Sequence, residues 1–367
     1  MRIALVVTGG FDRSGRERVI PSLLWLVERL AREHDVFVYV LRYHDAPCTY
    51  PLAGATIRDL GRPSGVLAQA HALHRALRAD GPFDVLHAYW AQPAGRLVSL
   101  LGRLTGTPTV VTLDSGEFAS LPQIGYGLQT TWQNRLAVRA ATRLATRDTV
   151  CSEFHAALAR AHGCSPLVIP LGVDTAIFTA RSTSPHGPPF RLLHVASQNP
   201  VKDQATLLRT VHRLVTNGLD VHLDIVGEDT MRGALVALTR ELQLEPRVTF
   251  HGFLASEQLV PLYHAAHLFV LTSLHEAAGV VLLEAAACGV PVTGSAVGYL
   301  ADWNGDRAVA VPPSDHGALA SAIRSLLLDD TRRHALATAA SAWATTHDAD
   351  WTARAFSALY RELAGSR

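Results

Sequence analysis

Short β-rich runs alternate with longer amphipathic stretches along this 367-residue chain, and no other feature constrains its fold as strongly. Strand-like runs in the first half lie at Arg2–Thr8, Val36–Leu41, Val85–Ala88, Thr109–Leu113, Thr149–Cys151 and Leu167–Pro170. Helix-like stretches lie between them, at Val19–Arg32, Leu67–Ala79, Pro93–Leu104 and near Gln133–Leu144. Strands that alternate with helices at this spacing indicate βαβ units and a parallel sheet.

The alternation stops at Thr179–Pro189, a run rich in Ser, Thr and Pro that is typical of a linker, and then restarts. Later strand-like runs lie at Arg191–Ala196, Val221–Val226, Val248–Phe250, Leu268–Leu271, Val290–Thr293 and Ala308–Val311. We therefore predict an α/β protein with two Rossmann-like domains facing a cleft, residues 1–178 and 190–349. A C-terminal helix over about 350–367 is expected to pack back on the first domain, with the linker as a hinge.

Composition excludes several functional classes. The formal net charge of +1 argues against a dedicated nucleic-acid binder. No run of eighteen apolar residues and no signal-peptide pattern occur, so we expect a cytoplasmic protein. The four cysteines form no C-x-x-C pair and the 18 histidines form no H-E-x-x-H motif, so we expect no disulfide framework and no metal site. The absence of G-x-G-x-x-G and P-loop motifs disfavours a dinucleotide oxidoreductase or a P-loop enzyme.

Lys202 is the only lysine among 33 basic residues, so 33 − 1 = 32 of them are arginines. In such a chain, the remaining lysine is a candidate for a site that needs a compact point charge. Lys202 lies in the segment His194–Asp203, where a strand is followed by a polar loop and a helix start. Because helix starts normally favour acidic residues, a lysine there indicates an anionic ligand such as a diphosphate.

The segment Leu271–Val292 carries the strongest functional signal. An apolar strand ends in a polar loop, and a helix is predicted to begin near Gly279 and to end at Gly289. The free amide groups at that helix start would bind phosphate, and Gly279 would let the anion approach closely. Glu276 and Glu284 bracket this site, and we interpret them as acceptors of hydrogen bonds from sugar and ribose hydroxyl groups.

These segments resemble glycosyltransferase family 4, the retaining nucleotide-sugar enzymes of the GT-B fold, over nearly the whole chain. The family pattern E-G-F-G-x-x-x-x-E-A-M-A-x-G-x-P-V is matched by Glu276–Gly279 and Glu284–Val292, and N-P-x-K-D is matched by Asn199–Asp203. The resemblance implies that Glu276 contacts the donor sugar and Glu284 the ribose. It also implies that the diphosphate binds Lys202 and the amides of Gly279, Val280 and Val281.

Shorter matches extend this resemblance. They are I-V-G-x at Ile225–Glu228, V-x-F-x-G-x at Val248–Phe253, I-P-x-G-V-D at Ile169–Asp174 and a Gly9-Gly10 loop. The donor site implied by the resemblance therefore also includes Ser197, Asn199, Gly227, Glu228, Phe253 and Gly10.

Two departures from the family pattern affect the expected site. Ser197 stands where the family usually has an arginine, so one cation on the diphosphate is missing or comes from elsewhere. In the segment Thr112–Glu117, Asp114 replaces the family's histidine, which faces the donor sugar. An ionised Asp114 offers no N–H donor, so it either accepts from a sugar hydroxyl, or is protonated by burial, or impairs catalysis.

The expected function is a retaining hexosyltransferase that moves a sugar from a UDP-, GDP- or similar donor to an acceptor hydroxyl. Glu276, Lys202 and Asp114 are the expected catalytic residues, and no cofactor or metal is expected. Three alternatives stay open. They are an inactive homologue that acts as a partner subunit, a sugar-nucleotide epimerase with Asp114 and Glu117 as its acids, and a phosphorylase of the same fold.

The acceptor is left open among a sugar, a lipid-linked molecule and a small molecule. Aromatic residues of the first domain that could stack on it are Phe11, Tyr89, Trp90, Tyr126 and Trp132, although many of these are expected in the core. Arg13, Arg16 and Arg18 have no hydrophobic flanks and are therefore expected to form a solvated face. The alternatives are contact with anionic lipid at the inner face of a membrane and contact with an acceptor phosphate.

Overall fold

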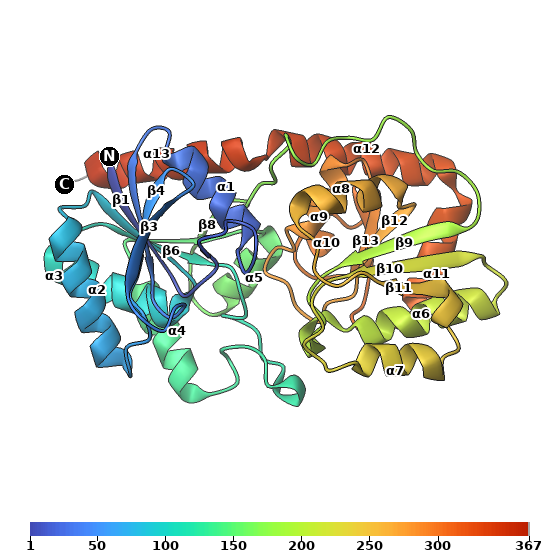
Figure 1. Ribbon diagram of the computed structural model, residues 1–367, viewed down its shortest axis with the longest axis horizontal. Coiled ribbons are helices and arrows are strands. Elements are labelled where there is room, and N and C mark those ends of the chain that lie inside the picture. The colour runs from blue at the N-terminus through green and yellow to red at the C-terminus, as the bar shows by residue number, and fades with distance from the viewer. Residues whose placement is uncertain (366–367) are drawn as a thin grey trace. The chain divides into compact units, whose positions relative to one another are not determined.

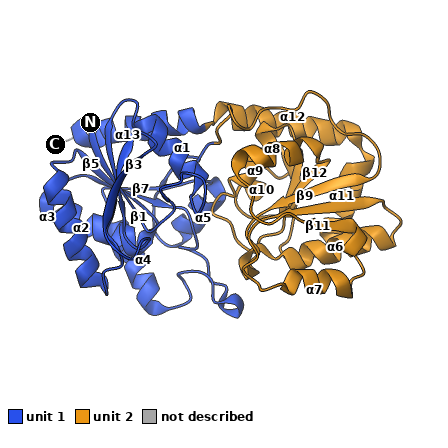
Figure 2. Ribbon diagram, viewed as in Figure 1, with its two compact units in different colours: residues 1–172, 349–367 blue, residues 173–348 orange. Residues whose placement is uncertain are grey.

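The computed structural model describes residues 1–365 and divides into two compact units (Figures 1 and 2). Unit 1 contains Met1–Gly172 and the helix that begins at Ala349, and unit 2 is Val173–Asp348. The expected first domain ended at 178 and the expected second domain spanned 190–349, so unit 2 also contains the predicted linker Thr179–Pro189. Positions 366 and 367 of the predicted C-terminal helix lie outside the described residues.

Unit 1 is built on an eight-stranded sheet, counted over residues 1–365, with the strand order β3-β4-β2-β1-β5-β6-β7-β8. The strands are β1 (Arg2–Val7), β2 (Asp35–Val40), β3 (Cys48–Leu52), β4 (Ala55–Asp59), β5 (Val85–Tyr89), β6 (Thr109–Leu113), β7 (Arg147–Val150) and β8 (Leu167–Val168). All neighbours pair in parallel except β3 and β4, which form an antiparallel hairpin. This hairpin was not predicted from the sequence.

Helices cover both faces of this sheet. They are α1 (Pro21–Leu30), α2 (Val66–Asp80), α3 (Arg96–Thr105), α4 (Trp132–Leu144), α5 (Glu153–Ala161) and α13 (Ala349–Gly365), with short turns at Ala91–Gly95 and Pro122–Ile124. Figure 1 shows α1 and α13 on one face and α2, α3 and α4 on the other. A core of buried aliphatic and aromatic side chains fills the space between the sheet and α2 to α5.

The C-terminal helix α13 packs on unit 1, as predicted. Phe356 and Tyr360 of α13 are completely buried. The Tyr360 hydroxyl lies 2.6 Å from Nδ1 of the buried His87 on β5, and Thr352 Oγ1 donates to the Pro170 carbonyl at 2.7 Å. Polar bonds therefore fix this helix to residues almost two hundred or more positions earlier in the chain.

Unit 2 holds a six-stranded parallel sheet, counted over residues 1–365, with the order β11-β10-β9-β12-β13-β14. The strands are β9 (Phe190–Val195), β10 (Val221–Val226), β11 (Val248–Phe250), β12 (Leu268–Leu271), β13 (Val292–Ser295) and β14 (Ala308–Val311). The helices are α6 (Gln204–Thr216), α7 (Ala234–Glu241), α8 (Ser256–Ala265), α9 (Val281–Ala287), α10 (Tyr299–Asp302), α11 (His316–Leu328) and α12 (Asp330–Thr346). Short turns lie at Pro200–Lys202 and Glu245–Arg247. The predicted linker Thr179–Pro189 contains no helix or strand.

The order of unit 2 places its functional loops. The chain runs from β9 outward to β10 and β11, and then returns to β12 on the other side of β9. The carboxyl ends of β9 and β12 therefore meet at the point where the strand order reverses, which is where open α/β sheets bind ligands. In unit 1 the corresponding point lies between β1 and β5, next to the loop that contains Gly10.

Candidate active site

The loops that follow β9 and β12 carry Lys202 and Glu276, and hydrogen bonds join the two loops. Thr272 Oγ1 donates to the Lys202 carbonyl at 3.0 Å, and the Leu274 amide donates to the Val201 carbonyl at 2.8 Å. Asn199 caps the short helical turn that ends at Lys202, because its Oδ1 accepts from the Val201 amide at 3.2 Å. Residues that are about seventy positions apart in sequence are thus held in one place.

Lys202 and Glu276 form an ion pair. Lys202 Nζ lies 2.6 Å from Glu276 Oε1, and Ser273 Oγ donates to the same oxygen at 2.6 Å. Their side chains are 24% and 12% exposed, so the pair is largely removed from water but open to a ligand. The structure therefore brings together the two residues that the sequence spacing singled out in unit 2.

Two glycines let the backbone pass closely around Glu276. Gly279 has φ +87°, a conformation that residues with a Cβ rarely adopt. A Cβ on Gly298 would lie 2.3 Å from the Ala278 carbonyl oxygen and 3.1 Å from Glu276 Cβ. The helix predicted to begin near Gly279 begins at Val281, because the left-handed backbone at Gly279 is incompatible with an α-helical conformation. Its first turn follows directly from the loop that carries Glu276.

Glu284 is a buried carboxyl group on α9. It is 6% exposed, and its Oε2 accepts from the Tyr263 hydroxyl at 2.8 Å. Burial raises the pKa of Glu284 to about 7, although the hydrogen bond from Tyr263 opposes this shift. Glu284 is therefore not a solvated helix residue, and the hydrogen bond from Tyr263 offsets part of the cost of burying its carboxyl group.

The other expected donor residues of unit 2 follow neighbouring strands. Ser197 is exposed after β9, and its carbonyl accepts from Gln204 Nε2 at 3.1 Å. Gly227 directly follows β10 and has φ +141°, and a Cβ there would lie 2.0 Å from the Ala196 carbonyl oxygen. The Glu228 carbonyl accepts from the Gln198 amide at 2.8 Å, and Phe253, after β11, is 57% exposed. These residues share the carboxyl edge of the sheet with Lys202 and Glu276.

His194 on β9 is a candidate that the sequence did not single out. It is completely buried, and its Nδ1 lies 2.8 Å from the Val270 carbonyl, which requires the proton on Nδ1. Its Nε2 is buried and has no hydrogen-bond partner among residues 1–365. Burial lowers the pKa of His194 to about 4, so the ring is neutral at neutral pH. A histidine inside an apolar strand is a weak signal, because most such residues only fill the core.

Asp114 lies in unit 1, directly after β6. Burial raises the pKa of the Cys151 thiol, and the charge and a hydrogen bond of Asp114 raise it further. Nearby Glu117 is completely buried and accepts from the amides of Ala91 at 3.2 Å and Ser115 at 2.8 Å. Glu117 therefore holds the loop after β6 in shape.

The exposure of the aromatic side chains of unit 1 decides which of them could stack on an acceptor. Phe11 and Tyr89 are completely buried and cannot stack on an acceptor, whereas Trp132 is 66% exposed.

Gly10 has φ +86°, and a Cβ there would lie 2.7 Å from Ile20 Cδ1. Arg13 and Arg18 lie over the rings of Tyr50 and Tyr43, at 5.0 and 4.7 Å. These contacts give the two arginines structural partners.

Neither a cluster of metal ligands nor a membrane-spanning helix occurs within residues 1–365. No group of three or more His, Cys, Asp or Glu side chains in this range is arranged to hold a metal ion. None of the helices in the same range combines the length and apolarity needed to span a membrane.

Solved structures share this fold. Sucrose-phosphate synthase from Thermosynechococcus elongatus superimposes with a TM-score of 0.82 at 21% identity, over 100% of both chains. Anabaena HepE, solved with UDP and glucose, gives a TM-score of 0.77 at 19% identity, over 99% of this chain and 100% of that chain.

Curated relatives are glycosyltransferases. Glycogen synthase from Mycobacterium tuberculosis is 33% identical over 54% of this chain and 49% of its own length, so this chain spans about half of that relative. D-inositol 3-phosphate glycosyltransferase 1 from Catenulispora acidiphila is 30% identical over 71% of this chain and 68% of its own length.

Two glycosyltransferase family models match this chain, one in each unit. The family described as "Glycosyl transferases group 1" matches residues 178–343, and the "Glycosyl transferase 4-like domain" matches residues 19–172. Together with the identity to the Catenulispora enzyme, these matches show that the chain belongs to glycosyltransferase family 4 and has the GT-B fold.

Proposed function

We propose that this glycosyltransferase moves a hexose from a nucleoside diphosphate sugar to an acceptor hydroxyl group, with retention of the anomeric configuration. The observation that carries the proposal is the Lys202–Glu276 pair, whose charged atoms lie 2.6 Å apart at the strand-order reversal of unit 2. A cation beside a carboxylate suits a ligand that joins a diphosphate to a polyhydroxylated ring.

In the proposed reaction, the bond between the anomeric carbon and the donor phosphate oxygen breaks, and the nucleoside diphosphate leaves with the electron pair. The acceptor oxygen forms the new bond on the same face of the sugar, and its proton passes to the departing phosphate. Lys202 stabilises the negative charge that develops on this phosphate. Glu276 accepts hydrogen bonds from the sugar hydroxyls and so orients the ring.

The donor's ribose is assigned to Glu284, which is buried beside Tyr263. Its diphosphate is assigned to Lys202 and the amides of residues 279–281, and the nucleoside is assigned to the edge formed by Ser197, Asn199, Gly227, Glu228 and Phe253. We propose that Asp114 and Gly10 contribute from unit 1, Asp114 as an acceptor for a sugar hydroxyl. We further propose that the reaction needs no metal, because Lys202 supplies the positive charge on the leaving group.

Ligand binding is tested first with UDP, GDP, ADP and dTDP and their common sugar conjugates in a thermal-shift experiment. A ligand that binds only the folded state raises the unfolding midpoint by mass action. We expect one nucleotide class to raise it selectively. No shift with any of these nucleotides would contradict the proposal.

Catalysis is tested with Lys202→Ala and Glu276→Ala. Each should lower the rate of sugar transfer by about a hundredfold or more, since each removes an interaction at the reacting groups. The double variant K202M/E276Q removes both charges together, so it separates loss of activity from the cost of leaving one charge unpaired. A double variant that melts like the wild type and transfers sugar at the wild-type rate would refute both assignments.

A further inference from the structure

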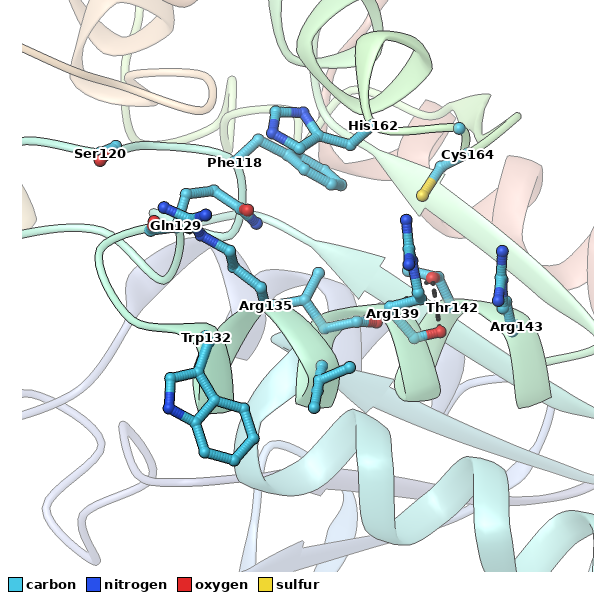
Figure 3. A pocket seen from close by; sticks show the side chains of 13 residues that line it. Phe118, Ser120, Gln129, Trp132, Arg135, Arg139, Thr142, Arg143, His162 and Cys164 are labelled. Atoms are coloured by element: carbon cyan, nitrogen blue, oxygen red, sulfur yellow. Dashed lines mark hydrogen bonds between the residues drawn. The ribbon is translucent and has the colours of Figure 1, made fainter.

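A cavity of about 780 Å³ lies entirely within unit 1, along one side of α4. Its walls come from the loop after β6, from α4 itself and from the turn that follows α5, including Phe118, Arg139, Arg143, His162 and Cys164. Figure 3 shows Arg139 and Arg143 extending from α4 toward the turn that carries His162 and Cys164. This volume is within the range of cavities that bind organic ligands in other proteins.

The cavity is positively charged. Arg135, Arg139 and Arg143 follow one another at four-residue spacing, so they lie along one side of the helix. None of the described side chains that line the cavity is a carboxylate. Arg135 donates from Nε to the Gln129 carbonyl at 2.7 Å, whereas the guanidinium groups of Arg139 and Arg143 have no hydrogen bond or ion pair with other residues in 1–365.

The helix dipole does not account for both arginines. Arg143 lies in the last turn of α4, where a positive side chain interacts favourably with the helix end. Arg139 lies one turn earlier, where this effect has largely decayed. Two exposed arginines about 6 Å apart along the helix therefore line a cavity whose lining residues include no carboxylate.

Apolar and aromatic side chains form much of the remaining wall, beside the polar Ser120, Gln129 and Thr142. The rings of Phe118 and His162 pack with their centroids 5.2 Å apart, while Trp132 and Leu136 line the cavity near the start of α4 and are 66% and 53% exposed. A ligand that fits all of these walls combines a doubly charged anionic group with a ring or another apolar part.

We propose that this cavity is a second ligand site, which binds a small phosphate-bearing organic molecule through Arg139 and Arg143. The site is made from unit 1 alone and uses none of the residues assigned to the donor. The paired guanidinium groups hold the phosphate, and the aromatic walls hold the organic part.

The test uses 1-naphthyl phosphate as the probe, which joins a phosphate monoester to an aromatic ring, and measures its affinity by calorimetry. The variant R139Q/R143Q should weaken binding about tenfold or more, because it removes two charge-assisted contacts. The matched variant R240Q/R324Q removes two exposed arginines of unit 2 that have no ion pair within residues 1–365, and it should bind like the wild type. Equal weakening in both variants would overturn the proposal, since it would reflect net charge alone.

Two further measurements distinguish the cavity from the donor site and from a lipid surface. Lys202→Gln should leave probe binding unchanged, whereas loss of binding in this variant would place the probe in the donor site and refute the proposal. Vesicles with roughly one-third phosphatidylglycerol in phosphatidylcholine test a lipid surface as the source of phosphate. Vesicle binding that depends on Arg139 and Arg143, without binding of the soluble probe, would also refute the cavity site. Circular dichroism melting of every variant verifies that the fold is intact.

Discussion

Glu284 is a carboxyl group that the fold keeps away from water, and the cost of doing so depends on pH. Its pKa is raised from 4.5 to about 7 by burial, so the folded chain binds this proton more tightly than the unfolded chain does. Its contribution to stability is therefore fully present below pH 4.5 and is lost as the pH rises through 7.

Glu284→Gln should remove this pH dependence. The free energy of unfolding of the variant, relative to the wild type, should rise by about 2–3 kcal/mol between pH 4.5 and pH 8. Denaturant unfolding at a series of pH values measures it. Glu241→Gln, at an exposed glutamate of α7, is the control and should follow the wild type at every pH. A constant difference for Glu284→Gln across this range would mean that Glu284 ionises normally.

At this scale, the sequence predicted residues whose type was unusual for their place. Lys202 stood out as the only lysine, and Glu276 and Glu284 stood out as acids around an apolar helix. In the structure, Lys202 Nζ and Glu276 Oε1 lie 2.6 Å apart. His194 gave no such signal, because its buried Nε2 becomes unusual only when its neighbours are known. Phe11 and Tyr89 were ambiguous for the same reason, since an aromatic residue suits a core and a binding surface equally.

Among the elements, α13 depends on a buried polar contact with β5. His87 is completely buried, with Nδ1 2.6 Å from the Tyr360 hydroxyl and Nε2 2.7 Å from Thr112 Oγ1. Both ring nitrogens are thus hydrogen-bonded, and burial lowers the pKa of His87 to about 3. The ring stays neutral and serves as a fixed connection between the helix and the sheet.

Tyr360→Phe should destabilise unit 1 by about 1–2 kcal/mol, because it leaves Nδ1 of His87 buried without a partner. Denaturant unfolding monitored by circular dichroism measures the change. In a double-mutant cycle with His87→Leu, the Tyr360→Phe substitution should cost less once the histidine is gone. Simple additivity of the two substitutions would show that this contact does not stabilise the docking of α13.

Elements with strong periodicity were the predictable ones. The strand limits Val221–Val226 and Leu268–Leu271 agree with the structure, and so does the linker without regular structure. The β3–β4 hairpin was missed because β3 is a partly exposed edge strand that contains Pro51, so it lacks a continuous apolar run. The start of α9 was expected near Gly279 and lies at Val281, but the left-handed backbone of Gly279 cannot be read from its identity alone.

On the scale of the whole molecule, the two units differ in whether one continuous stretch of chain forms them. Unit 2 is one continuous stretch, Val173–Asp348, with its own buried core. Unit 1 needs a helix from the other end of the chain, and α13 packs against α1 and buries Phe356 and Tyr360. Sequence periodicity could predict both sheets, but it could not predict the arginine-lined cavity, which arises only when α4 meets the turn after α5.

A fragment of residues 173–348 should therefore fold cooperatively by itself, whereas residues 1–172 alone should not reach the stability of unit 1 in the full chain. Thermal unfolding of each fragment measures this, with the full chain as the reference. Adding a synthetic peptide of residues 349–365 to the 1–172 fragment should raise its unfolding midpoint, since the peptide binds only the folded form. Full stability of 1–172 without the peptide would contradict this prediction.

The discontinuity of unit 1 also sets an order of events during synthesis. The ribosome makes residues 1–172 first, yet α13, which covers one face of their sheet, is made only after all of unit 2. At about 5–20 residues per second, the wait lasts roughly ten to forty seconds. The first unit to be started is thus the last to be finished. During that interval the apolar side chains that α13 will cover are exposed to chaperones and to neighbouring nascent chains.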